Sequence, residues 1–289
     1  MPANLHLCLT VSSHLEKQKN DLKKIKVVDK FIGVFDSGVG GLSIMKELII
    51  KLPEENFLYI ADQKRIPYGT KSQNEIRNFS EKITRFLLAK GAKCIVISCN
   101  TASAAALSYL RKEFPNIPFI GIEPAIKPAA EKTKTKKIGV LATKGTFESE
   151  RYTSLIERFA NGIEILANPC IGLVELIEKG KIEHKETIEL LSKILNPMIL
   201  KGIDSIVLGC THYPFIQPIL ERMLPKNVII INPASAVAHH TRNRLAKLNI
   251  LVNQEKRKVQ FYTTGNSIYF QEQIKKLLQI DRKVNKLNW

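Results

Sequence analysis

Nine short apolar runs, separated by amphipathic stretches, constrain the fold of this chain more than any other feature. The runs are rich in β-branched residues and lie at 31–35, 57–61, 94–98, 119–122, 137–142, 163–167, 205–209, 228–232 and 259–264. Continuous apolar runs of this length are typical of strands buried on both faces, as in parallel sheets. We therefore expect each run to form a strand.

The stretches between the runs have the spacing of helices. Residues 72–91 place five apolar side chains on one helical face, namely Ile76, Phe79, Ile83, Phe86 and Leu87. Gly91 is a natural end for this helix. A second helix is predicted over 186–202, and Pro197 should end or kink it. Strands that alternate with helices predict an α/β fold with mostly parallel sheets.

The runs fall into two series that resemble each other. "IVISCNT" (95–101) and "IVLGCTH" (206–212) occur at the same depth in their series. A length of 289 residues also favours two compact domains. We therefore predict two similar α/β domains, joined by the Pro- and Lys-containing linker 123–137. Residues 1–30 are polar and Lys-rich, which predicts a loose basic N-terminal extension.

Composition limits the setting and the partners. The five cysteines are odd in number and include no CxxC pair, so a disulfide framework is not expected and a reducing cytoplasm is the predicted location. No apolar run approaches the length of a membrane span. The net charge is +17, but much of it lies near the two ends of the chain. Residues 1–30 hold six Lys against three acids, and residues 254–289 hold eight Lys or Arg against three acids. Without a nucleic-acid motif we favour a solvated basic surface, which can also attract a small anionic substrate.

Polar residues follow four of the predicted strands. The segments are 36–38, 99–101, 142–144 and 210–212, and the second and fourth begin with Cys99 and Cys210. Because ligands of parallel sheets bind beyond the carboxyl ends of the strands, we expect both thiols to meet in one interdomain cleft. Each cysteine lies at a predicted strand-to-helix turn, where a helix N-terminus should lower the pKa of its thiol.

Two opposed thiols are suited to racemisation. One group removes a proton from one face of a tetrahedral carbon, the other returns a proton to the opposite face, and the roles exchange in the reverse direction. Backbone N–H groups at the helix starts, with Asn100, Thr101 and Thr211, are candidate donors to a substrate carboxylate. Asp36 and His212 adjoin the thiols and could tune proton transfer or bind a substrate ammonium.

Other interpretations of the same residues stay open at this point. Cys99, Cys210 and His212 could hold zinc, although the usual closely spaced ligand pairs are absent. Cys99, His212 and Asp36 could mimic a cysteine protease, which leaves the second cysteine turn unexplained. "DSGVGGLS" (36–43) is neither phosphate-binding glycine motif, and we interpret its glycines as allowing the backbone to approach the ligand.

The remaining cysteines and lysines receive simpler interpretations. Cys94 and Cys170 lack a matching context and are predicted to pack in the core, and Cys8 to be a surface thiol of the extension. No lysine motif for a pyridoxal cofactor stands out. The predicted mechanism therefore needs no cofactor and no metal.

Five motifs in order resemble the glutamate racemases of the cofactor-independent aspartate/glutamate racemase family. They are "GVFDSGVGGLS" (33–43), "ADQKRIPYGTKS" (61–72), "SCNTASA" (98–104), "GVLATKGTFES" (139–149) and "GCTHYP" (209–214). The resemblance covers about residues 31–270. It implies interconversion of L- and D-glutamate, with the D-form supplied to peptidoglycan synthesis, and a homodimer.

The resemblance also implies roles for individual residues. Cys99 would handle the proton of D-glutamate and Cys210 that of L-glutamate, with Glu178 assisting near the second cysteine. The positions that match the family's substrate-binding residues are Asp36, Ser37, Tyr68, Gly69, Asn100, Thr101, Thr211 and His212. In the family the last segment returns to the first domain, which implies domains at 31–123 plus about 239–289 and at 124–238.

Two sequence details bear on this resemblance. The continuation His212-Tyr213-Pro214 favours glutamate, because related aspartate racemases usually carry Glu after Cys-Thr. Asn232 stands where an aspartate is common, which affects local contacts rather than the chemistry. A related racemase or decarboxylase, a nucleic-acid-binding protein and an inactive binding protein are the competing hypotheses.

Overall fold

The computed structural model describes residues 30–252, 255 and 257–289, and within this range Phe31–Trp289 form one unit. The predicted extension, apart from Lys30, and Cys8 lie outside the described residues. None of the helices described is long and apolar enough to cross a membrane.

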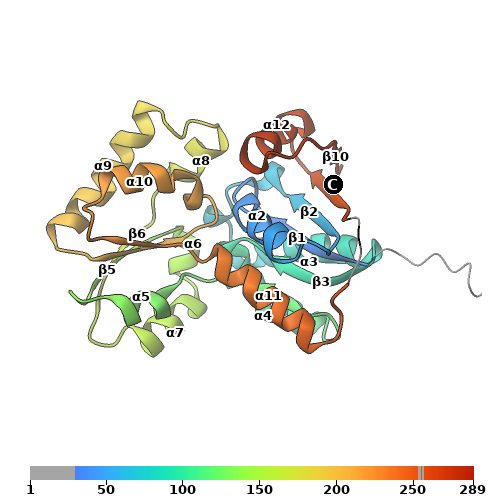
Figure 1. Ribbon diagram of the computed structural model, residues 1–289, viewed down its shortest axis with the longest axis horizontal. Coiled ribbons are helices and arrows are strands. Elements are labelled where there is room, and N and C mark those ends of the chain that lie inside the picture. Colours follow the sequence, from blue (N-terminus) through green and yellow to red (C-terminus); the bar gives the residue numbers. More distant parts are fainter. Residues whose placement is uncertain (1–29, 253–254, 256) are drawn as a thin grey trace, which may run out of the picture. The chain divides into compact units, whose positions relative to one another are not determined.

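The first of two sheets has six parallel strands in the order β10-β9-β2-β1-β3-β4. Its strands are β1 (Phe31–Asp36), β2 (Phe57–Ala61), β3 (Ala92–Ile97), β4 (Phe119–Gly121), β9 (Val259–Thr263) and β10 (Val284–Lys286). The C-terminal strands thus extend the sheet that the N-terminal strands begin (Figure 1).

The second sheet has four parallel strands in the order β6-β5-β7-β8. They are β5 (Lys137–Ala142), β6 (Glu164–Asn168), β7 (Ser205–Gly209) and β8 (Ile229–Ile231). All nine predicted strands are present, which confirms the prediction of two parallel-sheet α/β domains. The sequence missed β10, because this three-residue edge strand has one buried side chain, Val284, and no apolar run.

Helices cover both faces of each sheet. On the first sheet, α2 (Leu42–Lys51), α11 (Ala234–Lys247) and α12 (Ser267–Leu278) contribute to one core, and α3 (Gln73–Ala89) and α4 (Asn100–Glu113) to the other. On the second, α8 (Leu173–Glu178), α9 (Lys185–Leu200) and α10 (Gln217–Met223) lie opposite α5 (Ile126–Lys132) and α7 (Glu150–Phe159). The short elements are α6 (Lys144–Phe147), η1 (Gln63–Arg65), η2 (Tyr68–Thr70) and η3 (Tyr213–Ile216).

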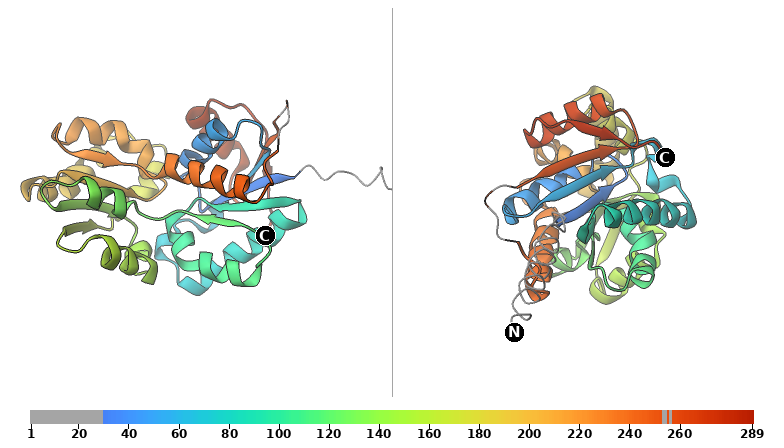
Figure 2. Two further views of the ribbon diagram at one scale, coloured as in Figure 1. Left: turned by 60° about the horizontal axis from the view of Figure 1, so that its bottom comes forward. Right: turned by 90° about the vertical axis from the view of Figure 1, so that its right-hand side faces the viewer.

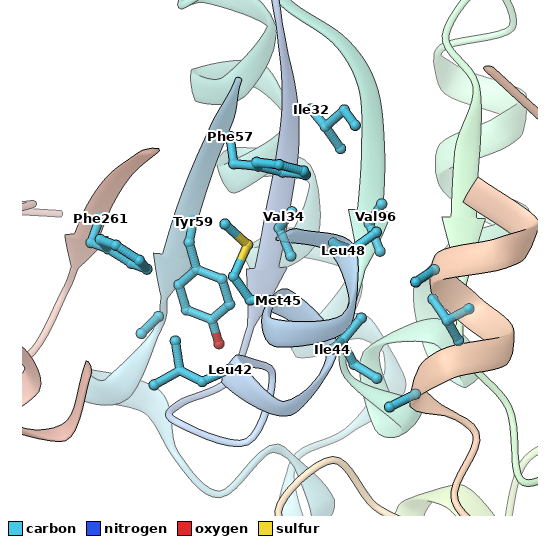
Figure 3. Close-up of a cluster of buried hydrophobic side chains, with 14 of the residues drawn as sticks. Ile32, Val34, Leu42, Ile44, Met45, Leu48, Phe57, Tyr59, Val96 and Phe261 are labelled. Carbon is cyan, nitrogen blue, oxygen red and sulfur yellow. The ribbon is translucent and has the colours of Figure 1, made fainter. Parts of the chain in front are cut away.

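Packing on both faces explains why the strands are apolar throughout. In β1, Ile32 and Val34 face one core while Phe31 and Phe35 face the other. Figure 3 shows the first of these cores, where side chains of β1, β2, α2 and β9 share one space. Cys94 and Cys170 are buried in cores of the two sheets, which confirms that they pack there.

Two helix predictions have different outcomes. Helix α3 lies within the predicted range 72–91: Ser72 and Glu75 form a capping box at its start, and Gly91 follows its end with φ of 101°. Of the two effects predicted for Pro197, the ending of the helix is wrong, because α9 continues to Leu200, and a kink stays a prediction. Pro197 and Lys193, whose carbonyl loses its helical donor there, are both exposed, while Ile194 and Met198 pack on the core.

The chain returns to the first sheet through α11, which contacts α2 and β4 (Figure 2). The predicted boundary near residue 239 falls within this helix. The domain bounds stay a prediction, and we propose placing the second crossing at Pro233, immediately before α11.

Candidate active site

A small cavity lies beyond the ends of strands from both sheets. Its volume is about 20 Å³, and it is lined by Ser37, Pro67, Tyr68, Gly69, Cys99, Asn100, Thr101, Thr143, Val174, Cys210, Thr211 and His212. The two matched cysteines therefore share one cavity. Nine of the eleven predicted site residues line it. The other two, Asp36 and Glu178, lie behind it and contact residues of its wall.

Cys99 is the N-cap of α4. Its Sγ accepts a hydrogen bond from the backbone N–H of Ala102 at 3.4 Å and lies 3.9 Å from Ser37 Oγ. The expected lowering of the pKa of Cys99 is wrong: burial raises that pKa, the nearby charge of Asp36 adds to the rise, and the Ala102 N–H opposes it less strongly. Cys99 is therefore protonated at neutral pH.

Cys210 lies beside an imidazole–carboxylate pair. Its Sγ is 3.7 Å from His212 Nδ1, and His212 Nε2 is 2.7 Å from Glu178 Oε1. Burial by itself lowers the pKa of His212, but hydrogen bonds to Cys210 and Glu178 outweigh it and hold that pKa well above its usual value. A charged imidazole at this position can donate a hydrogen bond from Nδ1 to the Cys210 sulfur.

Asp36, at the end of β1, connects the two sheets from behind the cavity. Its carboxylate accepts bonds from Gly38 N at 2.7 Å and from Thr211 Oγ1 at 2.9 Å. Burial raises the pKa of Asp36 to about 6, against the lowering effect of His212 and of these hydrogen bonds. Ser43 Oγ also donates to the carbonyl of Thr211 at 2.9 Å. These bonds hold the turn at 210–212, after β7 of the second sheet, against residues 36–43, after β1 of the first sheet.

The glycines after β1 make room for protein side chains. A Cβ on Gly38 would lie 2.1 Å from Glu178 Oε1, and a Cβ on Gly40 would lie 2.4 Å from His212 Nδ1. Among the described residues, the groups nearest these added Cβ atoms belong to Glu178, the last residue of α8, and to His212, in the turn after β7. The close approach of a ligand to this loop stays a prediction.

Asn100 provides unused hydrogen-bonding groups at the cavity. Its side chain is buried, and neither Oδ1 nor Nδ2 has a partner within the described residues. Because a buried amide without partners is costly, this side chain is suited to a polar ligand. The hydroxyls of Thr101 and Thr143 lie 2.8 Å apart on the same wall, and Tyr68 Oη donates to Asp62 Oδ2 at 2.6 Å.

Sequence reasoning did not include three of the lining residues, Pro67, Thr143 and Val174. Thr143 had a signal, because it is one of the polar residues that follow the predicted strands. Val174 had none, since an apolar residue in a short helix does not reveal what it faces. Asn232 does not line the cavity; its Oδ1 accepts a bond from the Ala234 N–H at the start of α11.

The geometry also bears on the two alternative sites. His212 pairs with Cys210 and Glu178, whereas the protease hypothesis required Cys99, His212 and Asp36 to act together. Within residues 30–252, 255 and 257–289, no group of three or more His, Cys, Asp or Glu side chains is placed to hold a metal ion.

A model of the Asp/Glu/Hydantoin racemase family matches residues 35–241, a range that includes both cavity cysteines. The chain belongs to this family. A protein of Pseudomonas paraeruginosa named glutamate racemase is 44% identical over 234 residues, which cover 81% of this chain and 88% of that protein. A glutamate racemase of Stutzerimonas stutzeri is 45% identical over 81% of this chain and 89% of its own length.

Solved structures give the same result for the fold. A glutamate racemase isoform of Bacillus anthracis has a TM-score of 0.81 and 33% identity, over 90% of this chain and 97% of its own. The Francisella tularensis glutamate racemase, solved in complex with D-glutamate, has a TM-score of 0.79 and 31% identity, over 91% and 98%. Both domains of this chain therefore have counterparts in racemases of the family.

Proposed function

We propose that this chain is a glutamate racemase that interconverts L- and D-glutamate with two cysteines and without a cofactor. The observation that carries the proposal is the pair of cysteines in one cavity, each following a strand of a different sheet. The names of the relatives at 44–45% identity support glutamate as the substrate.

The two thiols differ in their surroundings, which suggests their starting roles. Cys210 begins as the base, because the charged His212 beside it can donate a hydrogen bond to its sulfur. Cys99 begins as the acid, because burial keeps its thiol protonated. Cys210 takes the α-proton of L-glutamate, and Cys99 delivers a proton to the opposite face to give D-glutamate. The roles reverse for D-glutamate, as the family resemblance implies.

Other polar groups have supporting roles in this proposal. Asn100, Thr101, Thr211, Ser37 and the Tyr68-Gly69 turn line the cavity and bind the polar groups of the substrate. Asp36 and Glu178 hold Thr211 and His212 from behind. A cavity of about 20 Å³ has room for about one water molecule, so the walls must part to admit an amino acid.

The cellular setting is proposed from the family resemblance. We propose that the enzyme acts in the cytoplasm as a homodimer and supplies D-glutamate for peptidoglycan synthesis. Aspartate is the alternative substrate, and His212-Tyr213-Pro214 is the sequence feature that favours glutamate over it.

The test uses the purified protein and L-glutamate in D₂O without pyridoxal phosphate, with L-aspartate in parallel. Loss of circular dichroism and of the α-proton NMR signal is expected for glutamate alone. Cys99→Ser and Cys210→Ser should each abolish turnover, whereas Cys94→Ala, which alters a buried cysteine of the core, should retain it. Absence of both exchange and racemisation with the wild-type protein would refute the proposed function.

A further inference from the structure

Gln63 makes a contact with the active-site carboxylate that the proposed chemistry has not used. The two oxygens of Glu178 have different partners: Oε1 lies 2.7 Å from His212 Nε2 and accepts from Val39 N at 2.7 Å. Oε2 accepts from Gln63 Nε2 at 3.4 Å. Of the residues that the structure describes, Gln63 is the one whose donor contacts Oε2.

The direction of the Gln63 amide follows from its two partners. The carboxylate of Glu178 can only accept, so the amide NH₂ of Gln63 faces it and the amide oxygen faces Thr263, at the end of β9. The Thr263 hydroxyl donates to this oxygen at 2.8 Å and accepts from Gly265 N at 3.0 Å. The contact with the carboxylate therefore pairs a donor with an acceptor.

The surrounding backbone is built closely around this contact. A Cβ on Gly265 would lie 2.8 Å from Gln63 Cβ and 3.2 Å from its Oε1. Tyr269 Oη, on α12, donates to the backbone carbonyl of Glu178. Gln63, in η1 after β2, thus contacts the side chain of Glu178, and Tyr269 contacts its backbone, so two elements of the first domain hold this residue of α8.

We propose that Gln63, oriented by Thr263, is a positioning residue that holds the Glu178 carboxylate in place against His212. The inference rests on the proposed racemase function for its kinetic consequences. Gln63 does not line the cavity and touches no reacting atom; it acts through Glu178 and His212 on Cys210. Without it, Oε2 loses its donor and the carboxylate can turn away from the imidazole.

Several other charged or titratable groups surround this pair and stay unchanged in the test. His212 also faces Cys210 and the carboxylate of Asp36, and Glu178 also faces Asp36, Tyr59 and Tyr269. A variant of Gln63 alters none of these groups. A change in the titration of His212 therefore reports the placement of the Glu178 carboxylate.

The variants remove the contact in two independent ways. Gln63→Met keeps the size of the side chain and removes the donor, while Thr263→Val keeps Gln63 and removes the hydroxyl that orients it. Thr263→Ser restores that hydroxyl. Gln271→Ala is the matched control. Gln271, on α12, also donates from Nε2 to a carboxylate at 3.4 Å, but that carboxylate belongs to Asp281 and not to Glu178.

The first readout is the NMR titration of ¹⁵N-labelled His212, identified among the six histidines by its absence in His212→Asn. We expect Gln63→Met and Thr263→Val to lower the pKa of His212 by about half a unit or more, because an opposite charge held less closely favours the charged imidazole less. Thr263→Ser and Gln271→Ala should titrate as the wild type does. An unchanged or raised pKa in folded Gln63→Met would overturn the proposal.

The second readout is racemisation. The same two variants should lose about three- to tenfold in kcat/KM, equally in both directions because the equilibrium constant is fixed, and the basic limb of the pH profile should move to lower pH. If wild-type protein does not racemise glutamate, the proposed function fails, yet the His212 titration still decides the role of Gln63. A general loss of kcat/KM with the pH profile and titration unchanged would show a structural role only and refute positioning.

Discussion

Substituting Gly40 with alanine tests whether the glycine loop exists to admit His212. The new Cβ would lie 2.4 Å from His212 Nδ1 and 2.6 Å from Thr211 Oγ1. Reaching an ordinary contact of about 3.4 Å requires the imidazole to move by about 1 Å, because a Cβ atom makes ordinary van der Waals contacts at about 3.4 Å and beyond. Nδ1 is already 3.7 Å from Cys210 Sγ, so a displacement of this size away from the sulfur removes that hydrogen bond.

The expected loss follows from the kind of bond. A hydrogen bond that involves a charged group contributes about 1.5–3 kcal/mol, so Gly40→Ala should lower kcat/KM about 10- to 150-fold. Overpacking should also lower the free energy of unfolding by about 1–3 kcal/mol. Racemisation followed by circular dichroism and unfolding in urea measure the two effects separately.

Gly139→Ala provides the control for overpacking alone. Gly139 is in β5, and the nearest atom to its added Cβ is Sδ of the flexible Met198 at 3.2 Å. This variant should lose some stability and little activity. If Gly40→Ala keeps kcat/KM within twofold of the wild type and an unchanged His212 titration, the loop does not serve to seat His212.

Three further predictions concern buried charges. Thr211→Val removes a hydrogen bond to the charged Asp36, so the pKa of Asp36 should rise above about 6. An acidic limb of the activity profile should then move to higher pH. A limb that stays in place or moves to lower pH contradicts this prediction. The folded protein binds the Asp36 proton more tightly than the unfolded chain does. Loss of that proton therefore lowers the free energy of unfolding as the pH rises from about 4 to 6. The free energy of unfolding of Asp36→Asn relative to wild type should therefore increase by about 2–3 kcal/mol between pH 4 and 8 in urea titrations, and a constant difference would refute the assignment. Lys93 and Glu55 form a buried ion pair at 2.6 Å, so Lys93→Met should lower the free energy of unfolding by about 3–5 kcal/mol. Adding Glu55→Met should recover much of this loss, because it removes the unpaired buried charge. Equal stability of Lys93→Met and the wild type would show that the pair contributes nothing.

Local patterns in the sequence were sufficient for the elements and for much of the site. A strand between two helical layers needs apolar side chains on both faces, so nine of the ten strands could be located from their apolar runs. Cys99, Cys210 and their polar neighbours follow strands, and parallel strands place their carboxyl ends at one edge. The exceptions were β10, which has little apolar surface to bury, and Pro197, where packing of α9 holds the helix together.

The tertiary structure decided the properties that depend on what surrounds a residue. A helix N-terminus lowers the pKa of a thiol, but burial of Cys99 reverses that effect, and burial depends on every element packed around the cavity. The link from Thr263 through Gln63 to Glu178 and His212 joins positions as much as 200 residues apart. The sequence by itself determined which groups stand at the strand ends. Only packing of the two domains determined which of them share a proton, a charge or a cavity, because electrostatic effects depend on distance and solvent exclusion rather than on separation along the chain.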